Sequence, residues 1–237
     1  LFSGKTSSIR RMQALGNSVI VIDEIQALPI KVLKLFNAAM NFLSYFCNTS
    51  VILCSATQPL LDQLDNYRIL SPQGMIACNK KYYSACKRVE IVDCVKGNGF
   101  SIEETVEFIF EQAQCVNSIL VIVNTKKCAR EIFKQIRSKT DSNNTKTYEL
   151  FHLSTNMCPA HRKEVLTHMR KLLKIKNPSN TVICISTSLI EAGVDISFEQ
   201  VVRSLTGLDS IIQAAGRCNR NQEAAFGIVS IIDIHDE

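Results

Sequence analysis

The sequence predicts an α/β protein built on parallel sheets that are flanked by helices. Three observations lead to this prediction. From residue 89 onward, strand-like apolar runs alternate with longer segments of helical periodicity. The apolar runs are continuous and rich in β-branched residues, as in VIVI at 19–22, which is typical of strands buried on both faces. Polar residues follow several of these runs directly, and parallel sheets bind their ligands where the strands end.

The expected elements can be placed along the chain from these patterns. Before residue 60, strands at 19–24 and 51–54 enclose a helix at 30–46. An apolar stripe on this helix predicts that one side packs into the core; it consists of Leu33, Phe36, Ala39, Met40, Leu43 and Phe46. Further strands are expected at 89–92, 119–123, 147–151, 182–185, 200–203 and 227–232. Further helices are expected at 102–116, 126–137, 159–174 and 210–218.

Length and composition set the frame. With 237 residues the chain is long enough for one large domain or for a domain and a half. A composition shift around Pro72 and Gly74 marks a boundary, with one domain at 1–78 and another at 79–237. A formal net charge of +5 permits contact with nucleic acid without demanding it. Because the chain begins with Leu1 rather than Met, we expect it to be part of a longer protein.

The cysteine pattern and the hydropathy indicate a cytoplasmic protein. The ten cysteines include no CxxC pair, and Cys54 and Cys184 lie inside apolar runs. This pattern favours reduced cysteines in the core over a disulfide framework or a zinc site. No apolar run reaches the roughly 18 to 20 residues that a membrane span needs. We therefore expect a cytoplasmic location and no membrane partner.

Two carboxylates, Asp23 and Glu24, follow the first apolar run directly. At the carboxyl end of a central strand, Asp23 is placed to hold a magnesium ion through water. Glu24 is placed to polarise the water that attacks a terminal phosphate. The alternative is a pair of acids at a helix N-terminus, since Pro29 and a helical pattern follow soon after.

A second polar cluster is expected on the helix at 210–218. Asp209 is placed to cap this helix by accepting hydrogen bonds from its first turn. Gln213, Arg217 and Arg220 follow at spacings i, i+4 and i+7, which puts an amide and two guanidiniums on one face. Such a face suits a polyanion such as a triphosphate. The alternative is a solvated helix face with no ligand.

Several stretches resemble the motifs of superfamily two helicases, and most of all the CRISPR-associated helicase-nuclease of type I systems. EAGVDI at 191–196, LDS at 208–210 and QAAGRCNR at 213–220 are similar to motifs V and VI. DEIQ at 23–26 resembles the DExx box of motif II, and SATQP at 55–59 resembles motif III. Asn124-Thr125 resembles motif IV. The resemblance implies a RecA-like P-loop NTPase helicase core, with part of the first lobe at 1–78 and a complete second lobe at 79–237.

The resemblance also implies roles for individual residues. Arg220 becomes the arginine finger, and the catalytic set comprises Asp23, Glu24, Gln213, Arg217 and Arg220. The set that contacts or senses the nucleotide comprises Gln26, Gly193 and Asp195, where Asp195 accepts from a ribose hydroxyl or binds an arginine of motif VI. Ser55 and Thr57 couple the nucleotide site to movement. Asn124, Thr125 and Thr187 are implied to hold nucleic-acid phosphates.

The function implied is ATP-driven movement along single-stranded DNA in CRISPR antiviral defence. ATP and Mg²⁺ are the implied ligands, and a guide-RNA surveillance complex is the implied partner. Gly4-Lys5-Thr6 does not form a phosphate-binding loop, because no strand precedes it and the acidic strand follows too soon. We therefore expect the chain alone to hydrolyse little ATP. Two alternatives stay open: another superfamily two RNA or repair helicase, or a non-catalytic nucleic-acid-binding module.

Overall fold

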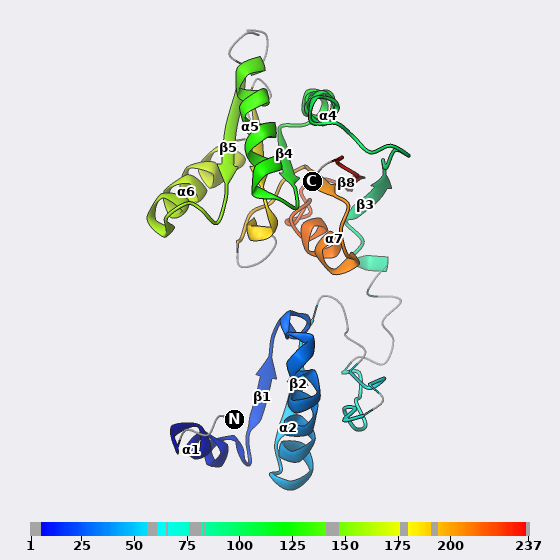
Figure 1. The fold of residues 1–237 in the computed structure, drawn as a ribbon, viewed down its shortest axis with the longest axis vertical. Coiled ribbons are helices and arrows are strands. Elements are labelled where there is room, and N and C mark those ends of the chain that lie inside the picture. Colours follow the sequence, from blue (N-terminus) through cyan, green and yellow to red (C-terminus); the bar gives the residue numbers. More distant parts are fainter. Residues whose placement is uncertain are drawn as a thin grey trace. The chain divides into compact units, whose positions relative to one another are not determined.

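The computed structural model describes residues 6–55, 61–64, 66–75, 82, 84–140, 147–175, 180–190 and 194–235. It divides the chain into two compact units, Leu1–Lys80 and Lys81–Glu237. This division lies close to the boundary expected from composition. Each unit has its own sheet, and the two are described separately below (Figure 1).

The first unit is a short α/β motif. Its helices are α1 (Thr6–Leu15) and α2 (Leu33–Phe46), preceded by 3-10 turns at Ile25–Ala27 and Ile30–Val32. Strands β1 (Val19–Ile22) and β2 (Ser50–Leu53) pair in parallel. The core lies between this sheet and α2, where Ala39, Met40 and Leu43 are buried against Ile20 and neighbouring side chains. The strands and the main helix were predicted, whereas α1 was not, because most of its residues are polar or basic and only Ile9, Met12 and Leu15 form an apolar stripe.

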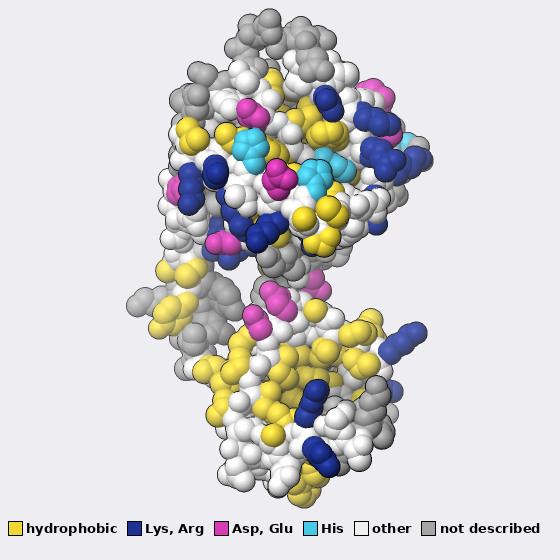
Figure 2. All heavy atoms as spheres, turned by 90° about the vertical axis from the view of Figure 1, so that its left-hand side faces the viewer, with side chains coloured by type: hydrophobic (Ala, Val, Ile, Leu, Met, Phe, Trp, Pro, Cys, Tyr) yellow, Lys and Arg dark blue, Asp and Glu magenta, His cyan; other side chains and the backbone are white. Residues whose placement is uncertain are grey.

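Two expectations about burial in this unit are wrong. Val19 and Val21 are 66% and 61% exposed, although their run was predicted to be buried on both faces. Phe46 is 81% exposed and lies outside the core stripe. The reason is that, in the part of the chain that the structure describes, this sheet has two strands and α2 covers one side of it. Figure 2 shows the resulting apolar surface on the first unit, in the lower part of the view.

The second unit is a six-stranded sheet in which every neighbouring pair is parallel. The strand order is β3-β8-β7-β4-β6-β5. The strands are β3 (Val89–Asp93), β4 (Ser118–Ile122), β5 (Thr147–Leu153), β6 (Asn180–Ser186), β7 (Gln200–Ser204) and β8 (Gly227–Ile232). The helices are α4 (Ile102–Cys115), α5 (Lys126–Thr140), α6 (Pro159–Ile175) and α7 (Leu208–Ala215), with a 3-10 turn at Ser188–Ile190. This architecture confirms the predicted α/β fold with parallel strands.

The two faces of this sheet carry separate cores because alternate residues of a strand point to opposite sides. Ile119 and Val121 of β4 pack with α4 and α5, as in the side-chain cluster that includes Ile109 and Ile132. Leu120 and Ile122 of the same strand pack with α6 and α7, against Met169 and Ala214 among others. All five residues of β4 are buried, as its continuous apolar run predicted.

The cysteines of the second core behave as small apolar residues. Cys184 and Cys218 are buried, and none of the cysteines that the structure describes forms a disulfide. Burial raises the pKa of both thiols, that of Cys218 to about 12, so both stay protonated at neutral pH. No helix within the described ranges is both long enough and apolar enough to span a membrane.

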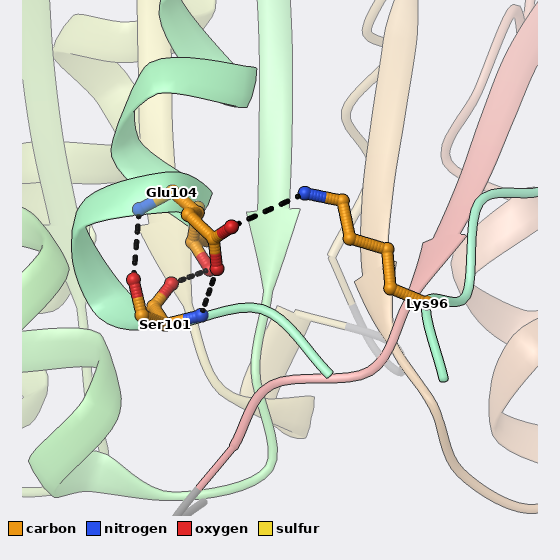
Figure 3. Close-up of polar contacts among 4 residues, drawn as sticks. Lys96, Ser101 and Glu104 are labelled. Atoms are coloured by element: carbon orange, nitrogen blue, oxygen red, sulfur yellow. Dashed lines mark hydrogen bonds and ion pairs between the residues drawn. The ribbon is translucent and has the colours of Figure 1, made fainter. Parts of the chain in front are cut away.

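Helix α4 begins with a capping box, drawn in Figure 3. The Ser101 hydroxyl accepts from the backbone N–H of Glu104 at 3.1 Å, and the Glu104 carboxylate accepts from the backbone N–H of Ser101 at 2.8 Å. Lys96 reaches the same carboxylate at 3.5 Å. The Ser101 backbone N–H and the Lys96 charge lower the pKa of Glu104.

Ser101→Ala is expected to destabilise the protein by about 1 kcal/mol, because one N–H of the first helical turn loses its acceptor. Urea unfolding of the two proteins measures the difference, and Ser138→Ala, which removes an exposed hydroxyl from α5, is the control. Because the pKa of Glu104 is lowered by folding, the contribution of its carboxylate is present above the unfolded pKa and is lost as the pH falls through the folded value. A Ser101→Ala effect no larger than that of the control would contradict this role.

Gly227 at the start of β8 leaves no room for a side chain. A Cβ placed there would lie 2.5 Å from the Cys218 Sγ and 3.2 Å from the carbonyl oxygen of Glu199. Both neighbours are fixed, since Cys218 is buried and Glu199 precedes β7. Gly227→Ala is therefore expected to destabilise the fold by about 1–3 kcal/mol through overpacking. Thermal unfolding measures this, with Gly97→Ala as the control, because a Cβ at Gly97 meets nothing within 4 Å. Equal melting temperatures for the two variants would refute the packing argument.

Candidate nucleotide and nucleic-acid site

The carboxyl end of β1 carries the two predicted acids, and both side chains are exposed. The backbone N–H of Glu24 donates to the Asp23 carboxylate at 2.9 Å. Glu24 has a left-handed backbone conformation, with φ 52° and ψ 45°, which ends the strand at Ile22 rather than at Glu24. Non-glycine residues in this conformation are strained by about 1–3 kcal/mol and gather at functional sites. Glu24 directly precedes the 3-10 turn at Ile25–Ala27, and its side chain makes no capping hydrogen bond there. The acids thus lie both at a strand end and at the start of a short helical turn.

Gln26 links this acidic pair to the end of β2. Its side-chain amide donates to the Glu24 carboxylate, and its carbonyl oxygen accepts from the Ser55 hydroxyl at 2.6 Å. The backbone N–H of Ile25 also donates to the carbonyl oxygen of Cys54 at 3.2 Å, which joins the two strand ends. The residues from the motif II and motif III stretches therefore form one hydrogen-bonded chain. Thr57, the other predicted coupling residue, lies outside the described residues.

The chemistry of this strand end fits a divalent cation. Mg²⁺ takes oxygen ligands and is usually held by one or two carboxylates together with water and substrate phosphates. Asp23 and Glu24 supply such carboxylates in an exposed position. Among the described residues there is no cluster of three or more His, Cys, Asp or Glu side chains placed to bind a metal.

In the second unit, the predicted helix carrying three ligands is wrong in its bounds. Helix α7 spans Leu208–Ala215, its N-cap is Gly207, and no side chain caps it. Asp209 lies inside the first turn, where a carboxylate is favoured by the exposed N–H groups but is not the cap. The helix ends because the chain turns away to pair with Phe198, whose backbone bonds to Arg217 and Asn219. Gln213 is therefore the one predicted ligand that lies on the helix.

Arg217 and Arg220 do not share a helix face with Gln213. Arg217 is buried, at 8% exposure, and its Nε donates to the carbonyl oxygen of Ile190 at 3.1 Å. Its guanidinium holds the turn after α7 against the segment that follows β6. The i, i+4, i+7 spacing was misleading because it assumes a helix that continues to Arg220, whereas α7 ends at Ala215.

Arg220 lies beyond the helix and forms an ion pair with Asp195, with Nε and Oδ1 3.0 Å apart. Its backbone N–H donates to the Ser197 hydroxyl at 3.0 Å. Of the two partners expected for Asp195, the structure contains the arginine. The Arg220 side chain is 40% exposed, so the pair contributes little stability and mainly sets the direction of the guanidinium. Gly193, two positions before Asp195, lies outside the described residues.

The three residues predicted to hold nucleic acid differ in their surroundings. The Thr125 hydroxyl accepts from the backbone N–H of Cys128 at 3.1 Å and so caps α5. The Asn124 amide donates to the Ser204 hydroxyl and to the carbonyl oxygen of Leu205, at 3.2 and 3.0 Å. The Asn124 side chain is exposed, and in this structure its amide donates within the protein. Thr187 is 6% exposed at the end of β6, so its hydroxyl does not face an incoming strand in this conformation.

Arg203 was not among the predicted site residues, although its position within a strand could have indicated a role. It is a charged residue inside the apolar run of β7, and it is 2% exposed. Its Nη1 donates to the Asn124 carbonyl oxygen at 2.7 Å. Charged residues are almost never fully buried unless they are paired. A charged residue within an apolar strand therefore indicates that polar partners surround it.

Comparison with known proteins finds that part of this chain is similar to CRISPR-associated helicases. Residues 115–223 match the family described as CRISPR-associated nuclease/helicase Cas3, C-terminal. A CRISPR-associated nuclease/helicase Cas3 from Haloferax volcanii is 61% identical over 41 residues, which is 17% of this chain and 4% of the relative. A protein of the same name from Methanothermobacter thermautotrophicus is 25% identical over 109 residues, which is 46% of this chain and 12% of the relative. The chain therefore spans a small part of the length of these relatives.

Solved helicase structures share the fold. The crystal structure of T. fusca Cas3-ATP matches with a TM-score of 0.67 and 14% identity, over 98% of this chain and 32% of that chain. A CRISPR RNA-guided surveillance complex in a pre-nicking state matches with a TM-score of 0.61 and 14% identity, over 92% and 31%. The Mycobacterium smegmatis helicase Lhr bound to ssDNA and AMP-PNP matches with a TM-score of 0.55 and 13% identity, over 97% and 33%. The chain is therefore similar in sequence to Cas3 proteins over part of its length, and it shares the parallel α/β fold of these solved structures.

Proposed function

We propose that this chain belongs to an ATP-dependent helicase or translocase of a CRISPR antiviral system, which moves along single-stranded DNA. The observation that carries the proposal is the hydrogen-bonded chain from Glu24 through Gln26 to Ser55. These hydrogen bonds join the end of β1, whose carboxylates suit phosphoryl transfer, to the end of β2. A change at the first strand end can therefore reach the second. The Cas3 family match over residues 115–223 gives independent support from the second unit.

In the proposed mechanism, residues of both units bind one ATP molecule. Asp23 would hold Mg²⁺, and the ion would supply positive charge beside the phosphates. Glu24 orients and deprotonates the attacking water. Gln26 keeps the Glu24 carboxylate in place and transmits its state to Ser55 and Thr57. Gln213 and Arg217 support the nucleotide side of the second unit.

Arg220 acts as the arginine finger, and Gly193 and Asp195 line the nucleotide side of motif V. A guanidinium aimed at the terminal phosphate stabilises the charge that develops in the transition state. Asp195 holds this guanidinium before ATP arrives, at the 3.0 Å distance given above. Transfer of Arg220 from Asp195 to the phosphate couples nucleotide binding to a rearrangement of motifs V and VI.

Single-stranded DNA is the proposed track, held by its phosphates at the N-terminus of α5, which Thr125 caps. Thr187 joins this set after movement of the segment that follows β6. A guide-RNA surveillance complex is the proposed recruiting partner and the cytoplasm the proposed location. Two of the similar solved structures support this proposal, since one is of a CRISPR RNA-guided surveillance complex and the other is of a helicase bound to ssDNA.

A second candidate function is a non-catalytic nucleic-acid-binding module that keeps the surface of a motor. Steady-state ATP hydrolysis by the complete reading frame, with and without single-stranded DNA, separates the two. The proposal predicts Mg²⁺-dependent hydrolysis that single-stranded DNA stimulates at least tenfold and single-stranded RNA does not. Binding of DNA without hydrolysis would establish the module instead, and stimulation by RNA alone would indicate another superfamily two helicase.

A further inference from the structure

We infer that Arg203 is a positioning residue that couples nucleic-acid binding at α5 to the nucleotide-facing helix α7. The inference rests on the proposed function. It assigns Arg203 and Asn124 a linking role in place of direct contact with either ligand. The evidence is a hydrogen-bonded cluster at the carboxyl ends of two neighbouring strands.

The cluster joins β4 to β7. These strands are parallel neighbours, with Ile122 in register with Arg203. Nη1 of Arg203 donates to the carbonyl oxygens of Ile122 and Ser204, at 3.3 and 3.0 Å, and to the Asn124 side chain at 2.7 Å. The Asn124 amide then donates back across the gap to the Ser204 hydroxyl and the Leu205 carbonyl oxygen. Two side chains thus tie both strand ends together in both directions.

The segments that leave these strand ends lead to the two proposed ligands. After Asn124, the chain passes through Thr125 into α5, whose first turn is the proposed phosphate contact. After Leu205, it passes through Gly207 into α7, which carries Gln213. A shift of the α5 N-terminus on binding DNA would therefore move Asn124, and Asn124 would move the start of α7 through Ser204 and Leu205.

A guanidinium has physical reasons to occupy this position. One nitrogen, Nη1, donates to acceptors from both strand ends, and the guanidinium keeps its charge when buried because it is not deprotonated in proteins. Burying a charge is costly unless hydrogen bonds compensate, so an apolar residue would serve β7 better if stability were the sole requirement. The position is 2% exposed and lies on a strand otherwise filled by valine and small polar residues. A buried arginine here is therefore suited to fix the relative position of two segments.

The test measures ATP hydrolysis and DNA affinity together in the complete reading frame. Arg203→Met keeps the length of the side chain and removes its donors. We expect it to lower stimulation by single-stranded DNA at least fivefold, while hydrolysis without DNA stays within twofold and the Kd for a labelled oligonucleotide stays within threefold. Arg203→Lys should recover part of the stimulation. Arg137→Met, on the exposed side of α5, is the matched control and should leave the ratio unchanged.

Ser204→Ala keeps the test decisive if Arg203→Met does not fold. It removes one acceptor of Asn124 but keeps the backbone carbonyl to which Arg203 donates. A lowered stimulation ratio in this variant, with an unchanged melting temperature, supports the coupling role. Unchanged ratios in folded Arg203 and Ser204 variants would overturn it, and so would equal losses with and without DNA. If the unaltered protein shows no stimulation by DNA, the proposed function itself fails and the coupling role with it.

Discussion

Glu24→Gln is expected to reduce ATP turnover by the complete reading frame about a thousandfold, the typical loss when a positioned general base is removed. The substitution is nearly isosteric, and the new side chain keeps an oxygen that accepts from the Gln26 amide. The link to Ser55 and the fold should therefore survive. What is lost is the negative charge that deprotonates the attacking water.

The expected signature is a loss in kcat with little change in ATP affinity. Steady-state phosphate release gives the first quantity, and binding of a fluorescent ATP analogue gives the second. Glu111→Gln, on the exposed side of α4, is the matched control and should leave both unchanged. A Glu24→Gln protein that retains a tenth or more of the original turnover would remove Glu24 from the catalytic set.

Arg220→Ala has the second large expected effect. An arginine finger accelerates phosphoryl transfer about 10³–10⁵-fold, so kcat should fall by at least a thousandfold. Arg220→Lys should recover little of this, because an ammonium cannot form the two parallel hydrogen bonds that a guanidinium offers to a phosphate. Single-turnover hydrolysis with the enzyme in excess measures the chemical step directly.

The same variant separates a catalytic role from a structural one. The Arg220 ion pair with Asp195 is exposed, and such pairs contribute about 0–1 kcal/mol. The melting temperature should therefore stay close to that of the unaltered protein. Normal hydrolysis by Arg220→Ala would show that Arg220 is not the arginine finger. Its ion pair with Asp195 would then be an ordinary surface contact.

The main elements of the fold were predictable from the sequence because the second sheet is built from continuous apolar strands. Residues 119–123 and 182–185 correctly indicated the centre of the sheet, since few other structures bury such runs on both sides. Val19 and Val21 belong to a similar apolar run but are exposed. The sequence pattern of a strand does not reveal how much of the protein covers it. The first helix was missed because most of its residues are polar or basic and its apolar stripe is short.

The candidate site was predictable where a strand end fixes the residues and unpredictable where a helix was assumed to continue. Asp23, Glu24 and Ser55 lie at strand ends, and their positions followed from the sheet. Arg217 and Arg220 follow Gly216, where the chain leaves α7 to pair with Phe198, and this long-range contact is invisible to a local spacing rule. The hydrogen bond between Arg203 and Asn124 could not be predicted, because the two residues lie far apart in the sequence.

The central claim is that Glu24 of the first unit and Arg220 of the second serve the same nucleotide. A structure of the complete reading frame with Mg²⁺ and AMP-PNP tests it most directly. If Arg220 is the arginine finger, its guanidinium has left Asp195 in that structure. It then lies within about 3 Å of an oxygen of the terminal phosphate, the range of a charge-assisted hydrogen bond. We also expect one water held between Glu24 and the same phosphate. A bound nucleotide with Arg220 still paired to Asp195, or with Glu24 turned away from the phosphate, would show that the two residues do not serve the same nucleotide.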